Sequence, residues 1–370
     1  MKLLSPSLLV SVLMSAAAVP ACGGGVSVSS EGSVATGGSS VSLAFADLSG
    51  SGVEPALEPD VVVASGKRGE VDVLVRQDFV SWRVFANYFS GGETVQVAGG
   101  RVANAGALFV RNTNGEVALM PTQAGTSHRL GFPVSIYHFI RNMVPTDSSP
   151  PATGFAIGDL DGDGSVEAVV AAPGLGLVVL PGLAAAADPK ISPEHPPTIN
   201  GFKLATGAQP REVVVTDVDG DGRADVAALD GDAPTLRTFV THSQKPLDIQ
   251  PDKTVTLPAV GASLRATGCP ATPLLVTLAD GRIVTVSRAG KVEPILDAMV
   301  PAHHVASSGD ALVVDSPRGL SLIDSCGDGG ALLGVDPIAA VALTPVNAAK
   351  TRELAVLQPD ANTVSLYQVR

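Results

Sequence analysis

The chain has 370 residues, and its composition excludes several classes of protein. It is 45% hydrophobic, with 40 Gly and 28 Pro but only 10 Phe, 3 Tyr and 1 Trp, which excludes a disordered chain and predicts an aliphatic core between many turns. A net charge of −12 disfavours a nucleic-acid-binding surface and favours a cationic partner. Three cysteines are too few for a disulfide-rich scaffold or a structural zinc cluster. Length alone allows either one large all-β domain or two ordinary domains.

Residues 1–21 have the layout of a secretory signal peptide: one lysine, an apolar run from Leu8 to Val19, and small residues before Cys22. The run is too short for a membrane span of about 20 residues. Val19 to Cys22 resembles the lipobox of bacterial lipoproteins, although Pro20 departs from its usual small residue. The resemblance implies that Cys22 is lipidated and holds the protein on the cell envelope, and Gly23 indicates the outer membrane. The alternative is a secreted protein in which Cys22 is free or paired.

The rest of the chain reads as all-β, with short aliphatic runs between turn residues. The clearest self-similarity is between Gly154–Gly174 and Glu212–Asp232, each an apolar strand, an Asp-rich loop and a second apolar strand. Their first aspartates, Asp159 and Asp217, are 58 residues apart. Four-stranded propeller blades repeat at about 40–50 residues and tolerate insertions, so this spacing indicates a propeller.

Weaker copies extend the repeat over residues 41–370. Further blades without an acidic loop are expected around 94–120, at 263–296 and at 303–334, and the last one shows only three strands. A ring needs every blade completed, and the segment Val26–Val34, within the tether of residues 22–40, can supply the missing outer strand. The sequence therefore predicts a single propeller with seven blades of four antiparallel strands, with six or eight blades as the alternatives.

Two nine-residue loops carry carboxylates at positions 1, 3, 5 and 9 and offer a backbone carbonyl at position 7. They are Asp159, Asp161, Asp163, Ser165 and Glu167, and then Asp217, Asp219, Asp221, Arg223 and Asp225. Four close carboxylates repel one another, and Ca²⁺, which accepts six to eight oxygens, removes that repulsion. An EF-hand would need Glu at position 12, where Val170 and Ala228 stand. About two structural Ca²⁺ ions are predicted. At Asp47, serines replace the central aspartates, so a turn without an ion is favoured there.

The two loops resemble FG-GAP or VCBS repeats, whose seven-bladed propeller also forms the head of integrin α subunits. The matching stretches run from Phe155 to Gly164 and from Val215 to Gly222, each followed by the position-9 carboxylate. The resemblance implies that each Ca²⁺ loop joins the innermost strand of a blade to the next strand and pins that hairpin. It also implies that Cys269 and Cys326 lie on one face of neighbouring blades, in position for a disulfide.

The sequence carries no zinc-protease, P-loop, dinucleotide or serine-hydrolase motif. The pair His303 and His304, with Asp310 nearby, is a weak candidate for a ligand or acid–base cluster, because adjacent side chains on a strand point to opposite faces. Three aromatic residues suggest either a sugar-stacking platform or, as the favoured reading, packing between blades: Trp82, Tyr88 and Phe89.

These observations predict a non-enzymatic, exported lipoprotein in which a Ca²⁺-stabilised propeller serves as a binding or adhesion scaffold for a protein or polysaccharide. We expect a monomer that contacts the membrane through its lipid anchor alone and binds no nucleic acid. The alternative is an extracellular propeller enzyme, a polysaccharide lyase or hydrolase with its site at the axial channel. Such an enzyme needs convergent ionisable side chains at the channel mouth.

Overall fold

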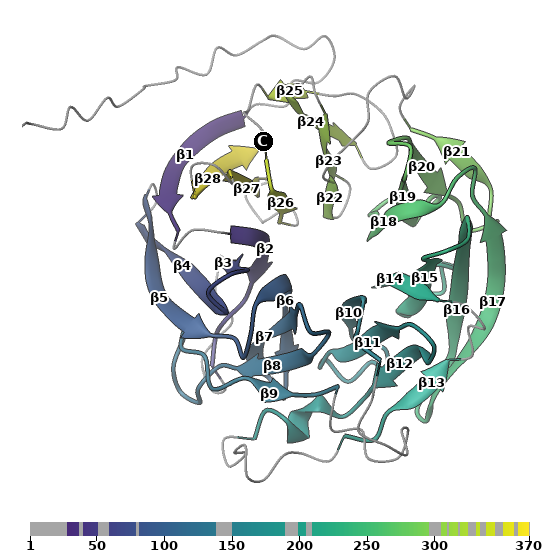
Figure 1. Ribbon diagram of the computed structural model, residues 1–370, viewed down its shortest axis with the longest axis horizontal. Helices are drawn as coiled ribbons and strands as arrows, with labels where there is room; N and C mark the ends of the chain where they lie inside the picture. The colour runs from purple at the N-terminus through teal and green to yellow at the C-terminus, as the bar shows by residue number, and fades with distance from the viewer. Residues whose placement is uncertain are drawn as a thin grey trace, which may run out of the picture.

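A computed structural model shows the fold. It describes the following residues: 28–36, 40–50, 59–78, 81–137, 150–188, 199–204, 209–295, 305–308, 311–316, 319–324, 331–333, 338–344, 351–358 and 362–369. Within them, 28 strands form seven four-stranded antiparallel sheets around a central axis (Figure 1). The predicted single all-β propeller with seven blades is confirmed.

The first four blades follow one another along the chain. Blade 1 contains β2 (Ser40–Ala46), β3 (Asp60–Ser65), β4 (Glu70–Asp78) and β5 (Ser81–Phe89). Blade 2 contains β6 (Thr94–Val102), β7 (Ala105–Asn112), β8 (Val117–Pro121) and β9 (Val134–Ser135). Blade 3 contains β10 (Gly154–Gly158), β11 (Glu167–Ala172), β12 (Gly176–Leu180) and β13 (Phe202–Leu204), with a short 3-10 turn at Leu183–Ala185. Blade 4 contains β14 (Pro210–Thr216), β15 (Asp225–Asp230), β16 (Thr235–Gln244) and β17 (Leu247–Thr256).

The remaining blades complete the ring. Blade 5 contains β18 (Gly261–Ala266), β19 (Leu274–Leu278), β20 (Ile283–Val286) and β21 (Val292–Pro294). Blade 6 contains β22 (Val305–Ser308), β23 (Ala311–Ser316), β24 (Gly319–Asp324) and β25 (Ala331–Leu333). Blade 7 contains β26 (Ala340–Leu343), β27 (Arg352–Gln358), β28 (Thr363–Val369) and, as its outermost strand, β1 (Val28–Ala35). The first strand of each blade packs against the first strands of its neighbours, so these strands line the axis.

The ring closes through the N-terminal strand, as the sequence predicts. β1 pairs antiparallel with β28, from Val28 opposite Val369 to Ala35 opposite Thr363. A buried charge cluster reinforces the closure: Arg76 on β4 donates from Nη2 to Glu31 of β1 at 2.6 Å and to Glu353 of β27 at 2.5 Å. The Arg76 guanidinium also lies 5.0 Å from the centre of the Trp82 ring, in cation–π contact. Blade 1 is thereby tied to two strands of blade 7.

The hydrophobic core lies between the blades rather than in one centre. The described residues form seven buried clusters, each shared by two adjacent sheets and built mainly from Val, Leu and Ala. Sheets that pack face to face with aliphatic side chains need few aromatics, which agrees with the composition. The inner strands approach most closely: a Cβ on Gly99 of β6 would lie 2.3 Å from the Cβ of Ala46 on β2, so only glycine fits there.

Of the three aromatic residues singled out on β5, Trp82 and Tyr88 pack between blades, as the favoured reading expected, and Phe89 does not. Trp82 packs against the cluster shared by blades 7 and 1, whereas Tyr88 packs against the cluster shared by blades 1 and 2. A register shift within the β4–β5 pair sends the two rings to different sides of the blade. Phe89 alone is exposed, so the three residues form no common platform. Among the described residues, no helix has the length and apolar character needed to cross a membrane.

Candidate metal centres

The two acidic loops occupy equivalent places in neighbouring blades. The first joins β10 to β11 in blade 3, and the second joins β14 to β15 in blade 4. In each case an innermost strand leads into the loop and the second strand of the blade begins with the position-9 carboxylate, Glu167 or Asp225. Because β11 and β15 are buried throughout, these two carboxylates are carried into the interior, with Glu167 2% and Asp225 0% exposed.

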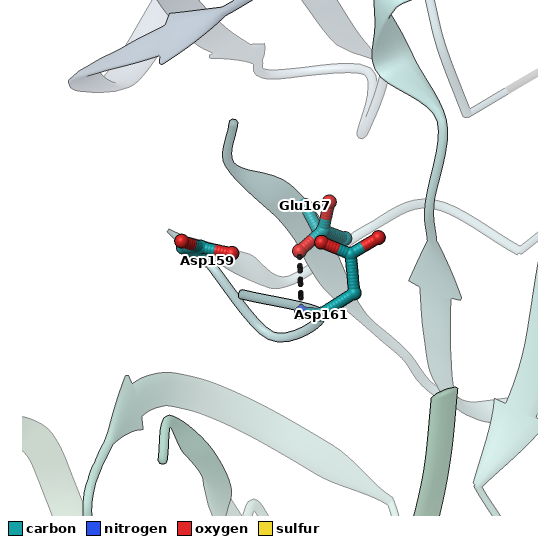
Figure 2. Close-up of side chains that lie close together, drawn as sticks. All are labelled: Asp159, Asp161 and Glu167. Carbon is teal, nitrogen blue, oxygen red and sulfur yellow. Dashed lines mark hydrogen bonds between the residues drawn. The ribbon is translucent and has the colours of Figure 1, made fainter. Parts of the chain in front are cut away.

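The first loop brings three carboxylates together. Oxygens of Asp159, Asp161 and Glu167 all lie within 4.8 Å of one another (Figure 2). The Glu167 Oε2 atom accepts hydrogen bonds from the backbone N–H of Leu160 at 2.7 Å and of Asp161 at 3.3 Å. The loop therefore wraps around a buried acid, and the two flanking aspartates point their oxygens toward it.

Backbone N–H groups fix the side chain of Asp159 at the start of this loop. Its Oδ1 accepts from Gly162 at 2.7 Å and from Asp163 at 3.1 Å, and its Oδ2 accepts from Gly164 at 3.0 Å. Gly162 and Gly164 adopt φ values of 72° and 89°, in the left-handed region that glycine tolerates without strain. The two glycines of the motif thus turn the backbone inward around the first carboxylate.

The second loop repeats this arrangement. Oxygens of Asp217, Asp219 and Asp225 lie within 4.8 Å of one another. Asp217 accepts from the N–H groups of Gly220 at 2.5 Å and Gly222 at 3.1 Å, as Asp159 does in the first loop. Asp225 accepts from Val218 N at 3.0 Å and from Thr241 N at 2.7 Å. Two segments with different sequences therefore build the same cage.

The remaining predicted ligands lie at the edge of these groups. Asp163 accepts the Ser165 N–H at 2.7 Å and is not among the three converging carboxylates. Asp221 accepts from the backbone N–H of Arg223 at 2.8 Å and from its Nε at 2.6 Å, and also from its Nη2. The hydroxyl of Ser165 accepts the Ala103 N–H of blade 2 at 3.3 Å.

Burial and the charges of neighbouring carboxylates raise the pKa of three of the converging acids, Asp161, Glu167 and Asp225. Burial, reinforced by the charges of Asp161 and Asp163, raises the pKa of Glu167 to about 7 against two opposing backbone hydrogen bonds. Burial also raises the pKa of Asp225, and burial together with the Asp163 charge raises that of Asp161. The pKa of Asp221 shifts the other way, because its hydrogen bonds to Arg223 lower it. The first cage thus gathers acids that form no ion pair with a described lysine or arginine, whereas Arg288 lies near one acid of the second.

The donor set fits a hard divalent cation. Every converging side-chain atom is a carboxylate oxygen, and among the described residues no lysine or arginine forms an ion pair with the three acids of the first loop. Oxygen-only sites of flexible geometry suit Ca²⁺ better than Mg²⁺, which requires a tight octahedron, and they do not suit metals that prefer nitrogen or sulfur.

At Asp47, in blade 1, a guanidinium stands where the other loops offer only carboxylates. Arg101, at the end of β6 in blade 2, donates from Nη1 to Asp47 Oδ2 at 2.5 Å and to Ser49 Oγ at 2.9 Å. Its Nη2 donates to the Asn104 carbonyl at 2.6 Å. The charge of Asp47 is therefore balanced from within the protein, which agrees with the expectation of a turn without an ion.

Each acidic loop is covered by the next blade in the ring, through the turn between that blade's third and fourth strands. In blade 4, the amide of Gln244 lies against Gly162, where an added Cβ would be 2.7 Å from its Nε2. In blade 5, the guanidinium of Arg288 lies against Gly220, and its Nη2 is 3.9 Å from Asp217 Oδ2. The first cage is covered by a neutral side chain and the second by a cationic one.

Sequence reasoning missed both arginines, because Arg101 and Arg288 act across blade boundaries at positions that no local motif marks. Cys269 lies between β18 and β19, as predicted, and is disulfide-bonded. The predicted partner Cys326 and the lipidation site Cys22 lie outside the described residues, as do His303, His304 and Asp310.

Comparison with solved structures agrees with this architecture. A structure described as BBS1N in complex with ARL6DN, soaked with lead, aligns with a TM-score of 0.61 at 12% identity, covering 90% of this chain and 94% of that chain. The same complex soaked with mercury gives 0.54 at 11% identity, over 85% and 88%. At such identity the likeness shows the fold alone. No protein-family model and no curated protein matches the chain.

Proposed function

We propose that this protein is a Ca²⁺-stabilised β-propeller of the FG-GAP or VCBS kind, exported and held on the cell envelope, where it serves as a binding scaffold for a protein or polysaccharide. The observation that carries the calcium part is the repeated convergence of three carboxylates, each including an acid that is almost fully buried. A buried, uncompensated carboxylate is costly, and a bound cation removes that cost.

The ligands of the first ion would be Asp159, Asp161 and Glu167, and those of the second Asp217, Asp219 and Asp225. When bound, Ca²⁺ would supply positive charge and hold the loop between the first two strands of its blade. The chain contributes the fixed orientation: backbone N–H groups hold Asp159 and Asp217, and the buried second strands hold the position-9 acids. The role of the ions is to make the blades rigid.

Export and lipidation are supported by the signal-peptide layout and by the lipobox-like residues before Cys22. The scaffold role is supported by a closed ring whose blades are tied at the closure, which gives a rigid surface for loops. The two similar propellers were both crystallised in complex with another protein, as their descriptions state, which favours a macromolecular partner for this fold.

Thermal unfolding with and without a chelator tests the proposal. We expect the chelator to lower Tm and added Ca²⁺ to restore it, because a ligand that binds only the folded state stabilises by mass action. Replacing Asp161→Asn and Asp219→Asn should each remove part of this shift. The matched control is Asp280→Asn, since Asp280 is an exposed acid already paired with Arg282. An unchanged Tm in chelator would refute the calcium proposal.

The envelope part has a separate test. Mass spectrometry of the protein produced with its N-terminal segment should show acylation of Cys22, and Cys22→Ser should abolish it and release the protein from membranes. A native protein that is cleaved but carries no lipid would instead identify a secreted form.

A further inference from the structure

The edge between blades 1 and 2 carries a hollow of about 390 Å³ that the calcium sites do not involve. One wall is the outermost strand β5, and the other is the connection between β8 and β9, residues 122–133. The lining residues are Phe85, Ala86, Tyr88, Gln123, Arg129 and Leu130. This volume lies in the lower part of the range typical of small-ligand sites, about 300–1,000 Å³.

The connection that forms the second wall is held in place by blade 1. His128 donates its backbone N–H to the Leu48 carbonyl at 2.9 Å, and its Nδ1 is 2.7 Å from Asp60 Oδ2. The hydroxyl of Tyr88 donates to the His128 carbonyl at 3.1 Å, and the Phe85 ring centre is 5.5 Å from that of His128. The two walls are thus fixed against each other, so the hollow is formed before any ligand binds.

Two planar polar groups project at this hollow. Gln123 and Arg129 are exposed, and a backbone hydrogen bond from Gln123 N to Arg129 O at 2.8 Å keeps them together. Neither side chain has a hydrogen-bond or ion-pair partner among the described residues. The nearby carboxylate of Asp60 is 3% exposed and is engaged by His128. In a protein of net charge −12, the free charge among the described residues that line this hollow is therefore positive.

Apolar surface continues beyond the hollow. The described residues include three exposed large hydrophobic side chains, and two of them, Phe89 and Phe132, belong to the segments that form the walls. Phe89 is 64% and Phe132 87% exposed. Phe89 precedes Gly91 by two residues, and Phe132 directly precedes Pro133. Gly91 and Pro133 lie side by side. The contact between Gly91 and Pro133 thus brings together the two segments that carry these exposed aromatics.

We propose that this hollow binds a sugar ring that carries a carboxylate, within an acidic polysaccharide. Phe85 and Tyr88 are partly buried against the cluster shared by blades 1 and 2, and their remaining exposed ring surface lines the hollow, where it attracts the polarised C–H groups of a pyranose. The Arg129 guanidinium matches a carboxylate in bidentate geometry, and the Gln123 amide can both donate to and accept from hydroxyls. An open hollow lined by side chains fits the exposed face of a ring better than an extended peptide, which is usually bound through backbone hydrogen bonds along a strand edge. The inference rests on the proposed scaffold role and names its ligand.

Calorimetric titration of the Ca²⁺-saturated protein with tetragalacturonate, and with a galactose tetramer of the same linkage, tests the inference. We expect the acidic tetramer to bind and the neutral one to bind at least tenfold more weakly. Arg129→Gln should weaken the acidic tetramer about tenfold or more, because a charge-assisted contact is lost. The control Arg83→Gln changes an exposed arginine on β5 that does not line the hollow, and it should leave binding within twofold. Phe85→Leu should weaken both sugars.

Several results would overturn the inference: no binding of the acidic tetramer, equal binding of both tetramers, or equal binding by native protein and Arg129→Gln at unchanged Tm. Tighter binding of a tetraglutamate peptide would assign the hollow to an acidic peptide and likewise reject it. Retention of the native protein on immobilised acidic polysaccharide separates the two proposals. If Arg129→Gln is retained as well as the native protein, the scaffold role stands and the hollow is not its binding site. If the native protein is not retained, polysaccharide is rejected as the ligand in both proposals.

Discussion

The turn at Asp47 in blade 1 and the acidic loop of blade 3 begin with the same structural problem and solve it differently. Both carry an aspartate directly after an innermost strand. In blade 1, the carboxylate meets Arg101 of the next blade, and a long connection from blade 2 covers the turn with backbone hydrogen bonds. In blade 3, three carboxylates converge, and none of them forms an ion pair with a lysine or arginine among the described residues, although the charge of Lys245 in blade 4 opposes the rise in the pKa of Asp161. A cation is built into the chain in one case, and in the other we propose that Ca²⁺ supplies it.

The comparison shows that the number of carboxylates decides which solution works. One guanidinium balances the partly exposed carboxylate of Asp47, where serines replace the central acids of the motif. Three converging acids, one of them buried, need a compact divalent charge reached from several sides at once. Blade 4 stands between the two, because Arg288 of the next blade lies 3.9 Å from one of its three converging acids.

Removing the buried acid of blade 3 should have the largest effect on stability, and this effect should depend on Ca²⁺. With Ca²⁺ at about 100 times its Kd, Glu167→Gln should lose about 2.7 kcal/mol of the free energy of unfolding, the share of one bound ion. In chelator it should match or exceed the native protein, because the amide removes a buried charge. Asp47→Asn should instead show the same small loss in both conditions. Denaturant unfolding measures the free energy of both variants. Equal losses for Glu167→Gln with and without Ca²⁺ would contradict Ca²⁺ binding by the blade 3 loop.

Removing the built-in cation of blade 1 should have a smaller effect that does not depend on calcium. Arg101→Gln leaves Asp47 without its partner, and we expect a loss of about 1 kcal/mol, since both side chains are partly exposed. The same loss should appear in chelator and in saturating Ca²⁺. A loss that Ca²⁺ reverses would mean that the turn at Asp47 takes up an ion once the guanidinium is gone.

The His128–Asp60 pair beside this turn should give blade 1 a pH dependence. Its hydrogen bond to Asp60 raises the pKa of His128, while burial raises that of Asp60 despite the histidine. A raised histidine pKa stabilises the fold fully below the unfolded value of about 6.5 and loses that contribution as the pH rises through the folded value. Between pH 6 and 9, in saturating Ca²⁺, the free energy of unfolding should fall further in the native protein than in His128→Asn. We expect the difference to be below about 1 kcal/mol. Asparagine suits the positive φ of 64° at this position. Parallel curves would contradict this assignment.

The smallest effect should come from the cation that covers the second cage. Arg288→Gln removes a positive charge near Asp217 and gives blade 4 the same cover as blade 3, where Gln244 stands. We expect Ca²⁺ to bind the second loop about two- to fivefold more tightly, which is the scale of a partly exposed ion pair. Calorimetric Ca²⁺ titration of Asp161→Asn, with and without Arg288→Gln, isolates the second loop. Weaker binding after the change would show that Arg288 supports the cage instead.

The pattern of covering turns also bears on the cysteines. In three neighbouring pairs, the turn after the third strand of one blade lies over the first loop of the blade before it. Cys326 stands in the chain between β24 and β25, the third and fourth strands of blade 6. Arg288 has the same position in blade 5, between β20 and β21. The pairing of Cys269 with Cys326 remains a prediction.

The sequence by itself determined what local pattern can encode. Alternating short aliphatic runs and turns predicted the all-β class, the 58-residue spacing predicted the propeller, and the three-strand last blade predicted closure by the N-terminal segment, observed at Val28–Ala35. Asp and Gly at fixed positions within nine residues predicted the acidic cages, because every converging carboxylate of a cage comes from one loop.

Only the tertiary structure decided what lies between blades. Arg101 reaches Asp47 across 54 residues, Arg76 joins strands from both ends of the chain, and Gln123 and Arg129 face Phe85 and Tyr88 of another blade. No local spacing marks these contacts. In a propeller the core and the binding surfaces form where separate sheets meet, so the partners of a side chain are set by ring geometry rather than by its neighbours in sequence.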